Sequence, residues 1–174
     1  KDYNHIEVSA GFYANPHNRG TAVNLLDVVV LGATEIDLNF NVNVNTHSDG
    51  MLQYPTGGHS DTAAGAKLTI ITAPLVRGRI PVVVDDVVVV STPGESIDVL
   101  VTDYGIAVNP RRKELIYRLK DAGIPLKTIE ELRDIAYSIT GKPNKPEFTD
   151  KIVALIEYRD GTLIDILREV QPLQ

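Results

Sequence analysis

The sequence predicts an α/β fold with a mixed, largely parallel sheet and helices packed on it. Apolar runs of strand length recur through the first part of the 174-residue chain. Two segments with helical periodicity follow residue 109, and a last segment alternates around an Asp-Gly turn. Strands followed by helices in one chain are typical of the α/β classes. A chain of this length can bury one sizeable core, so we predict a single domain over residues 1–174.

Several apolar runs are continuous rather than alternating. Continuous runs suit strands that are buried on both faces of a sheet covered by helices. The predicted strands of this kind are residues 28–31, 68–72, 80–84, 87–90 and 99–101. Between two valine runs, Asp85-Asp86 predicts a tight hairpin turn or a bulge that joins two short strands.

Two helices have local start signals. In the first, Asn109 can act as N-cap and Pro110 suits the first helical position. The second begins with a capping box formed by Thr128 and Glu131. Each carries an apolar stripe: Leu115, Ile116, Leu119 and Ala122 in the first, and Ile129, Leu132, Ile135, Ala136 and Ile139 in the second. Residues 151–158 and 162–170 predict a hairpin around Asp160-Gly161, with a helix still possible for the last segment.

Composition excludes several classes of function. The net charge of −6 argues against affinity for nucleic acid or an anionic membrane. The sequence has no cysteine, which excludes disulfides, thiolate metal sites and cysteine nucleophiles. No apolar run has the length of a membrane span. We therefore expect a cytoplasmic protein. The chain opens with neither an initiator Met nor a signal-peptide pattern, which predicts one domain of a longer enzyme.

The segment from Phe40 to Lys67 is the strongest candidate for chemistry. It begins with an alternation in which Phe40, Val42 and Val44 fall on one side of a predicted strand. The opposite side carries four asparagines: Asn39, Asn41, Asn43 and Asn45. Asparagine is a poor strand former, so four on one face indicate a surface kept for hydrogen bonding.

Two glycine-bearing loops follow this strand. The first is His47-Ser48-Asp49-Gly50, and the second, Gly57-Gly58-His59-Ser60-Asp61, leads into a helix start at residue 62. A polar strand end, a Gly-Gly turn and a helix N-terminus together suit a polar or anionic ligand. The alternatives are plain turn chemistry, with Ser60 as an N-cap, a Ser-His-Asp triad, or a metal held by two histidines and two aspartates. Adjacent residues point apart, which disfavours the triad, and we expect no metal.

Four separated motifs in this chain closely resemble those of the alpha chain of bacterial citrate lyase. They are GATEID at residues 32–37, FNVNVNTHSDG at 40–50, the TGGHSDTAAGAK segment at 56–67 and VTDYGIAVNP at 101–110. More loosely, residues 57–61 resemble the GGQ-x-D loop of the acetyl-CoA hydrolase and 4-hydroxybutyrate CoA-transferase group, and residues 101–107 its V-T-E-Y-G-x-A signature. The resemblance covers nearly the whole chain and corresponds to the C-terminal part of a longer alpha chain.

The resemblance implies a CoA-transferase-like fold and an acyl-thiol transfer, in which acetyl thioester plus citrate gives citryl thioester plus acetate. It implies a CoA-like thiol, the phosphoribosyl-dephospho-CoA arm of the small gamma chain, and a beta chain that cleaves the citryl thioester. It also implies an N-terminal domain of the same chain as a partner. In the related transferases a glutamate upstream of the region matched here forms a covalent thioester, and neither Glu7 nor Glu35 lies in a motif that matches the one around that glutamate. Direct transfer in a ternary complex agrees with this.

These lines of argument predict a site around the second glycine loop. We expect Gly57, Gly58 and His59 to be catalytic, with backbone N–H groups acting as an oxyanion hole worth about 3 kcal/mol per donor. Citrate carries three carboxylates and needs donors. The predicted substrate-binding residues are Asn43, Asn45, Thr46, His47, Ser48, Ser60, Asp61 and Arg19.

Two other functions stay open from the sequence. One is a non-catalytic assembly domain of the lyase complex, which exposed apolar positions at 115–119 or on the terminal hairpin would favour. The other is a sugar-phosphate isomerase or sensor domain of similar fold. In the transferase interpretation, the 174-residue chain alone is expected to be inactive, because the opposing domain is missing.

Overall fold

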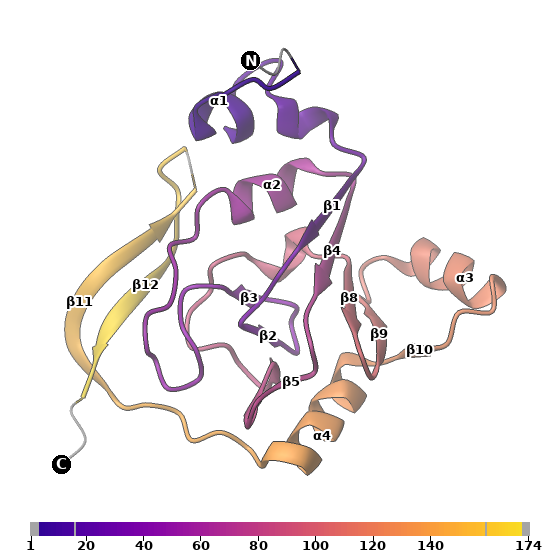
Figure 1. The fold of residues 1–174 in the computed structure, drawn as a ribbon, viewed down its shortest axis with the longest axis vertical. Helices are drawn as coiled ribbons and strands as arrows, with labels where there is room; N and C mark the ends of the chain where they lie inside the picture. Colours follow the sequence, from indigo (N-terminus) through magenta and orange to yellow (C-terminus); the bar gives the residue numbers. More distant parts are fainter. Residues whose placement is uncertain (1–3, 16, 159, 172–174) are drawn as a thin grey trace.

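A five-stranded sheet is the largest element of the computed structural model, which describes residues 4–15, 17–158 and 160–171 (Figure 1). Its strands, in spatial order, are β1 (Val28–Leu31), β4 (Leu68–Thr72), β8 (Val99–Thr102), β9 (Gly105–Val108) and β10 (Leu126–Lys127). The pair β8 and β9 is antiparallel, and the other neighbours run parallel. The predicted mixed, largely parallel sheet is confirmed.

Smaller sheets lie beside it. One has the order β3 (Val42–Asn43), β2 (Glu35–Asp37) and β7 (Val83–Val84). A second is the short pair β5 (Val76–Arg77) and β6 (Ile80–Pro81). The third is the curved hairpin of β11 (Phe148–Glu157) and β12 (Leu163–Val170), at the left of Figure 1. This hairpin confirms the prediction around Asp160-Gly161 and makes the last segment a strand.

The helices are short except for two. They are α1 (Ala10–Ala14), the 3₁₀ turns η1 (Ala22–Leu25) and η2 (Gly94–Ser96), α2 (His59–Gly65), α3 (Lys113–Asp121) and α4 (Ile129–Thr140). Helix α2 lies beside β1, α4 packs on β6, β7 and β9, and α3 stands away from the sheet (Figure 1). The core forms where α4, α2, the small β2 sheet and one face of the large sheet meet. In the part of the chain that the structure describes, no helix is long and apolar enough to span a membrane.

The predicted strand over residues 39–45 is wrong in length. Its first half is a turn in which the Phe40 N–H donates to the Asp37 carbonyl at 2.9 Å. The Asp37 carboxylate accepts the N–H groups of Asn39 and Asn41 at 2.8 and 3.0 Å. Phe40 adopts a left-handed φ of 64° while its side chain is fully buried. Side-chain acceptors that capture backbone N–H groups compete with a strand ladder, so only Val42–Asn43 pairs.

The predicted strand over residues 87–90 and its hairpin turn are also wrong. The N–H of Val88 donates to the Glu35 carboxylate at 3.3 Å, and that of Val90 donates to Asp165 at 2.7 Å. Asp85 does not lie in a hairpin turn. Its carboxylate forms ion pairs with Arg133 in α4 and with Lys142 just after that helix. Because its donors are used by distant side chains, this segment has no partner strand.

The predicted helix starts differ in outcome. The capping box of α4 is present, with the Glu131 N–H donating to the Thr128 hydroxyl at 3.1 Å. Asn109 does not cap α3, which begins at Lys113; its side-chain amide instead donates to the Gly94 and Ile97 carbonyls. In the α4 stripe, Ile129, Leu132 and Ala136 are buried and Ile135 is partly buried, while Ile139 at the end is exposed. No residue of α3 is buried.

The prediction that residues 28–31 form a strand buried on both faces is wrong. This strand is at the edge of the sheet, and its residues alternate between exposed and half-buried. Val28 and Val30 are 50% and 58% exposed, although the sequence predicts a fully covered strand.

Candidate functional site

The loop from Thr46 to Gly58 leaves β3 and folds back on Asn45. The Asn45 carbonyl accepts the N–H of Gln53 at 2.6 Å, and its side-chain amide donates to the Tyr54 carbonyl at 2.9 Å. The Asn45 side-chain oxygen accepts from the hydroxyls of Thr56 at 3.1 Å and Ser91 at 2.5 Å. Asn45 therefore uses its side chain to close the loop that delivers Gly57 and Gly58 to the start of α2.

Asn43 and Glu35 form a buried polar centre under this loop. The Asn43 amide donates to Glu35 Oε2 at 2.8 Å and to Thr46 Oγ1 at 2.8 Å. Ser48 Oγ donates to Glu35 Oε1 at 2.5 Å. Glu35, Asn43 and Thr46 are each no more than 1% exposed, and Ser48 is 8% exposed. The predicted ligand donors Asn43, Thr46 and Ser48 thus hold the loop by bonds within the chain.

His59, the first residue of α2, is held on both sides of its ring. Nε2 lies 2.9 Å from the Gly32 carbonyl, and Nδ1 lies 2.7 Å from Thr92 Oγ1. A carbonyl only accepts, so Nε2 carries the hydrogen and Nδ1 accepts from Thr92 in the neutral ring. Burial lowers the pKa of His59, an effect only partly opposed by the Gly32 bond. To donate to a substrate, His59 would first have to break its bond to Gly32.

The lowered pKa of His59 predicts a pH dependence of stability. As pH falls below the ordinary value of 6.5, the unfolded chain takes up this proton before the folded chain does. The contribution to stability is therefore complete above pH 6.5 and is lost on acidification. Between pH 7.5 and 5.5, the free energy of unfolding of the wild type should fall more than that of His59→Gln, measured by urea unfolding at each pH. Equal losses in the two proteins would contradict this.

Gly57 and Gly58 form the turn before α2. Gly57 has a φ of 59° and is exposed, so it takes a backbone conformation that L-residues rarely adopt. Gly58 is the N-cap and supplies no side-chain hydrogen bond. The first N–H groups of a helix have no partner within it. The His59 N–H donates to the Thr56 carbonyl at 3.3 Å, so the donors that this end can offer are those other than His59. The helix begins at His59, so Ser60 is not the N-cap; Ser60 and Asp61 are buried in the first turn.

The two His-Ser-Asp triplets do not converge on a metal. His59 is engaged as described, and His47 lies in a turn closed by the Gly50 N–H and the His47 carbonyl at 2.9 Å. Among residues 4–15, 17–158 and 160–171, no group of three or more His, Asp or Glu side chains could hold a metal ion. Turn chemistry accounts for the first triplet, since Asp49 Oδ1 accepts the N–H of Met51 at 2.9 Å.

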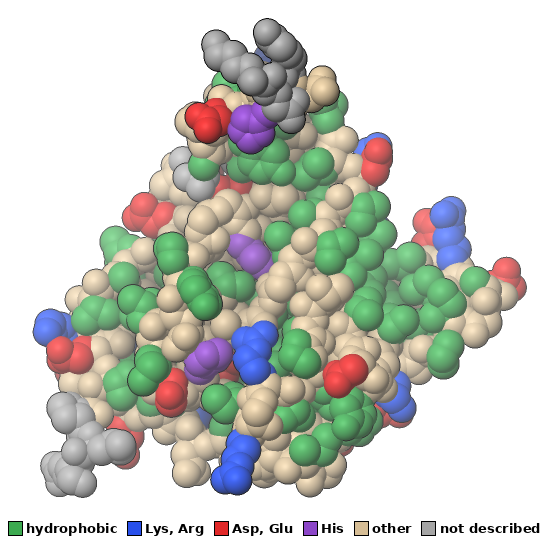
Figure 2. Space-filling view, viewed as in Figure 1, with side chains coloured by type: hydrophobic (Ala, Val, Ile, Leu, Met, Phe, Trp, Pro, Cys, Tyr) green, Lys and Arg blue, Asp and Glu red, His purple; other side chains and the backbone are tan. Residues whose placement is uncertain are grey.

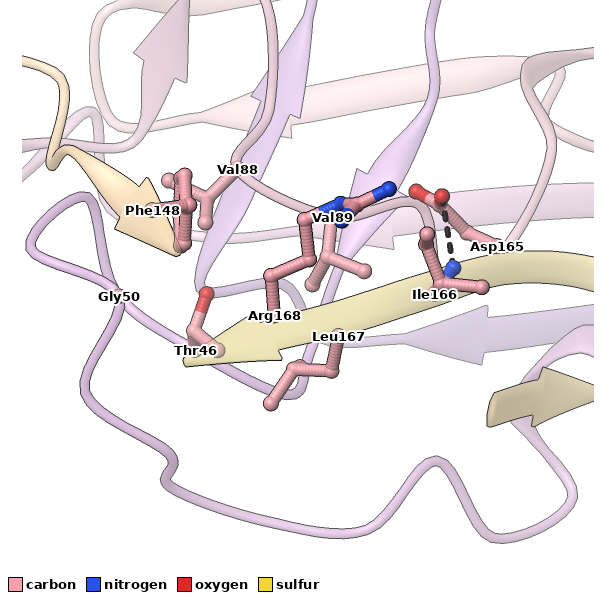
Figure 3. Close-up of a pocket in the computed structure, with 9 residues that line it drawn as sticks. All are labelled: Thr46, Gly50, Val88, Val89, Phe148, Asp165, Ile166, Leu167 and Arg168. Carbon is pink, nitrogen blue, oxygen red and sulfur yellow. Dashed lines mark hydrogen bonds between the residues drawn. The ribbon is translucent and has the colours of Figure 1, made fainter. Parts of the chain in front are cut away.

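Arg19 lies apart from this cluster. It is exposed in the loop between α1 and η1, two residues after His17, whose ring bonds to Asp160 at the hairpin turn. A different guanidinium, that of Arg168 on β12, lies with Thr46 in a cavity of about 330 Å³ between the hairpin and the loops at residues 46–50 and 88–89 (Figure 3). Of the predicted substrate-binding residues, Thr46 lines this cavity.

The sequence analysis missed two features of the site. One is the central acceptor, Glu35, which lies in the GATEID motif but was not predicted to belong to the site. The other is a set of large apolar side chains on the loop before Gly57, each at least 63% exposed: Met51, Leu52 and Tyr54. The sequence does contain an indication of this surface: three large apolar residues lie in a loop with glycine and proline, where burial is not expected.

Comparisons with known proteins agree on one family. A family model described as the citrate lyase alpha subunit, CitF, matches residues 1–170. Citrate lyase alpha chains from Klebsiella pneumoniae and Escherichia coli are 60% and 57% identical to this chain over 168 residues. A crystal structure described as the alpha subunit of citrate lyase from Streptococcus mutans, in complex with citrate, is 54% identical and superimposes with a TM-score of 0.92 over 98% of this chain.

The chain spans about a third of the length of these relatives: 33% of each of the two curated chains and 33% of the crystallised one. The matches do not confirm the expected C-terminal position within them. They favour the citrate lyase interpretation over a sugar-phosphate isomerase or sensor. The four sequence motifs, the mixed sheet and the family match over residues 1–170 lead to one conclusion: this chain belongs to the family of citrate lyase alpha subunits.

Proposed function

We propose that this chain forms part of the acyl-thiol transferase of citrate lyase, which exchanges acetate for citrate on an acyl-carrier thioester. The observation that supports this most directly is the close structural match to a citrate lyase alpha subunit that was crystallised with citrate. In the proposed reaction, a citrate carboxylate attacks the carbonyl carbon of the acetyl thioester and the thiolate leaves, which gives a mixed acetyl–citryl anhydride. The thiolate then attacks the citryl carbonyl of this anhydride, and acetate leaves. Acetyl thioester and citrate are consumed, and citryl thioester and acetate are formed.

The turn at Gly57 and Gly58 is the proposed oxyanion site. When a carboxylate attacks the thioester carbonyl carbon, negative charge develops on the carbonyl oxygen. Backbone donors at the uncapped start of α2 are fixed before the reaction, because Asn45 anchors the loop and His59 is held by Gly32 and Thr92. Preorganised donors of this kind stabilise developing charge at little reorganisation cost. His59 then acts by positioning the turn, and its predicted catalytic role is reduced to this.

The acyl-carrier arm requires a surface beside this turn. We assign it the exposed side chains of Met51, Leu52 and Tyr54, which precede Gly57 in the loop closed by Asn45. When bound, the arm supplies the thioester that carries the acyl group. The contribution of the three side chains is to cover the apolar part of the arm and to exclude water next to the turn.

Removing one backbone donor tests the site. Gly58→Pro removes an N–H, whereas Gly58→Ala keeps it. The φ of −96° at this position is ordinary for alanine and lies about 30° from the value that the proline ring favours. In the complete alpha chain, we expect Gly58→Pro to lower kcat by about 100-fold and Gly58→Ala to change it little. The assay follows conversion of acetyl to citryl carrier by intact mass. Equal rates for the two variants would remove the oxyanion role, and turnover by the 174-residue chain alone would remove the requirement for the rest of the alpha chain.

A second function, assembly of the lyase complex, is favoured by one observation. The hairpin exposes four large apolar side chains, each 48–57% exposed: Ile152, Val153, Leu155 and Leu163. Such a patch is typical of a protein–protein contact. The complete alpha chain with Leu155→Asp should then fail to co-elute with the beta and gamma chains in size-exclusion chromatography while keeping its own elution volume. Unchanged co-elution would remove this surface from the assembly.

A further inference from the structure

The large sheet has two apolar faces. Paired residues of neighbouring strands point to the same side, so the registers define one face, called here the outer face. It consists of Val28, Val30, Leu68, Ile70, Thr72, Val99, Val101, Ile106, Val108 and Leu126. Only Thr72 among these ten is polar. The opposite face carries Ile71, Leu100 and Ala107 into the core.

The connections from β1 to β4 and from β4 to β8 run over the core face, whereas the parallel pair β9 and β10 is joined through α3. The segment from β1 to β4 contributes Ala63 of α2 to the core, and the segment from β4 to β8 contributes Leu75, Val83 and Ile97. Successive crossovers of the same hand, with strands added in one direction, fall on one side of a sheet. Neither of them therefore covers the outer face.

Side chains of the outer face differ in how exposed they are. At one end Val99 and Val108 are buried, at 6% and 8% exposure, while Val28 and Val30 are 50% and 58% exposed. Leu68, Ile70, Val101 and Ile106 are half-buried. Figure 2 shows hydrophobic side chains gathered over β1 and β4 and onward over α3.

A face of this composition is built for burial. Sheets that present one face to water alternate apolar and polar residues, whereas parallel strands covered on both sides are continuously apolar. The edge strand β1 reads Val-Val-Val-Leu and has no lysine or proline, the residues that commonly protect a free edge.

We propose that the outer face, from β1 to β8, is covered by the remainder of the alpha-chain polypeptide. The relatives are about three times as long as this chain, which spans 33% of the Klebsiella pneumoniae alpha chain and 33% of the Streptococcus mutans one. That additional length is part of the same molecule in every copy. A permanent cover is what a nearly charge-free face requires, because it leaves no apolar patch exposed between binding events.

Thiol labelling of the complete alpha chain tests this. The sequence has no cysteine, so Val28→Cys and Val30→Cys each place a single thiol within these residues. Ser138→Cys, on the exposed side of α4, is the control. Maleimide labelling is followed at each position by peptide mass spectrometry. In the native protein, Cys at 28 and 30 should react on the order of tenfold slower than Cys at 138, and all three should react alike in urea.

The outcomes separate the possible occupants. Labelling at 28 and 30 as fast as at 138 in the native protein would overturn the proposal. Protection that is lost on dilution would assign the face to a second copy of the chain, and protection that needs added beta and gamma chains would assign it to them; both overturn it. The readout is independent of transferase activity, so the proposed function can fail without affecting this result.

Discussion

Glu35→Ala is expected to lower the free energy of unfolding by about 4 kcal/mol, because it leaves two buried donors and one partly buried donor without an acceptor. These donors are the Asn43 amide, the Ser48 hydroxyl and the Val88 N–H, at 2.8, 2.5 and 3.3 Å from the carboxylate. Glu35 is 1% exposed, so water cannot replace it without rearrangement. The loss is read from urea unfolding at neutral pH.

Glu35→Gln is the matched control. It keeps the volume and one acceptor oxygen. Its new amide can donate to Ser48 Oγ, because a hydroxyl also accepts, while the remaining oxygen still faces Asn43 and Val88. We expect a loss of about 1 kcal/mol. A Glu35→Ala loss no larger than that of Glu35→Gln would mean that the three donors find other partners, and that this centre does not hold the loop.

Local signals were sufficient for the elements with contiguous chemistry. The capping box of Thr128 and Glu131 and the Asp160-Gly161 turn involve residues within a few positions of each other, and both were predicted correctly. The parallel strands β1, β4 and β8 were likewise predicted from their apolar runs. These features depend on backbone propensity and on short-range hydrogen bonds, which the sequence contains directly.

The errors arose where a distant or neighbouring side chain took a backbone donor. Val88 and Val90 have high strand propensity, but their N–H groups donate to Glu35 and Asp165, 53 and 75 residues away in the chain. The Asp37 carboxylate similarly turns the chain before Val42. Propensity gives no indication of such partners, because they are fixed only by the tertiary fold.

For the candidate site, too, some features could be predicted from the sequence and others could not. The sequence predicts the Gly-Gly turn and a helix after it, and the structure places them together, although the helix begins at His59 rather than at the predicted residue 62. The asparagines were correctly predicted to form hydrogen bonds, but Asn43 and Asn45 bond within the chain. In sequence, a polar face that binds a ligand is the same as one that bonds to a loop of the same protein. Only the burial of these side chains in the structure distinguishes the two cases.

The second large effect is expected at Gly94, which allows η2 to lie directly against the turn at Phe40. A Cβ at this position would lie 2.0 Å from the Asn39 carbonyl oxygen and 2.8 Å from the Phe40 carbonyl carbon. Both are backbone atoms, so neither can rotate away. Gly94 is also bonded on both sides, with its N–H donating to Asn41 Oδ1 and its carbonyl accepting from Asn109. Gly94→Ala should lower the free energy of unfolding by about 3 kcal/mol.

Gly11→Ala is the control for Gly94→Ala, because it adds the same methyl group in a short helix with no atom within 4 Å of the new Cβ. Removing a helical glycine changes stability by about 0.5–1 kcal/mol in the favourable direction. Urea unfolding of both variants should therefore give shifts of opposite sign. If Gly94→Ala instead unfolds like the wild type, the turn at Phe40 yields to the methyl group. Such a result would mean that Phe40 can leave its left-handed conformation without a loss of stability.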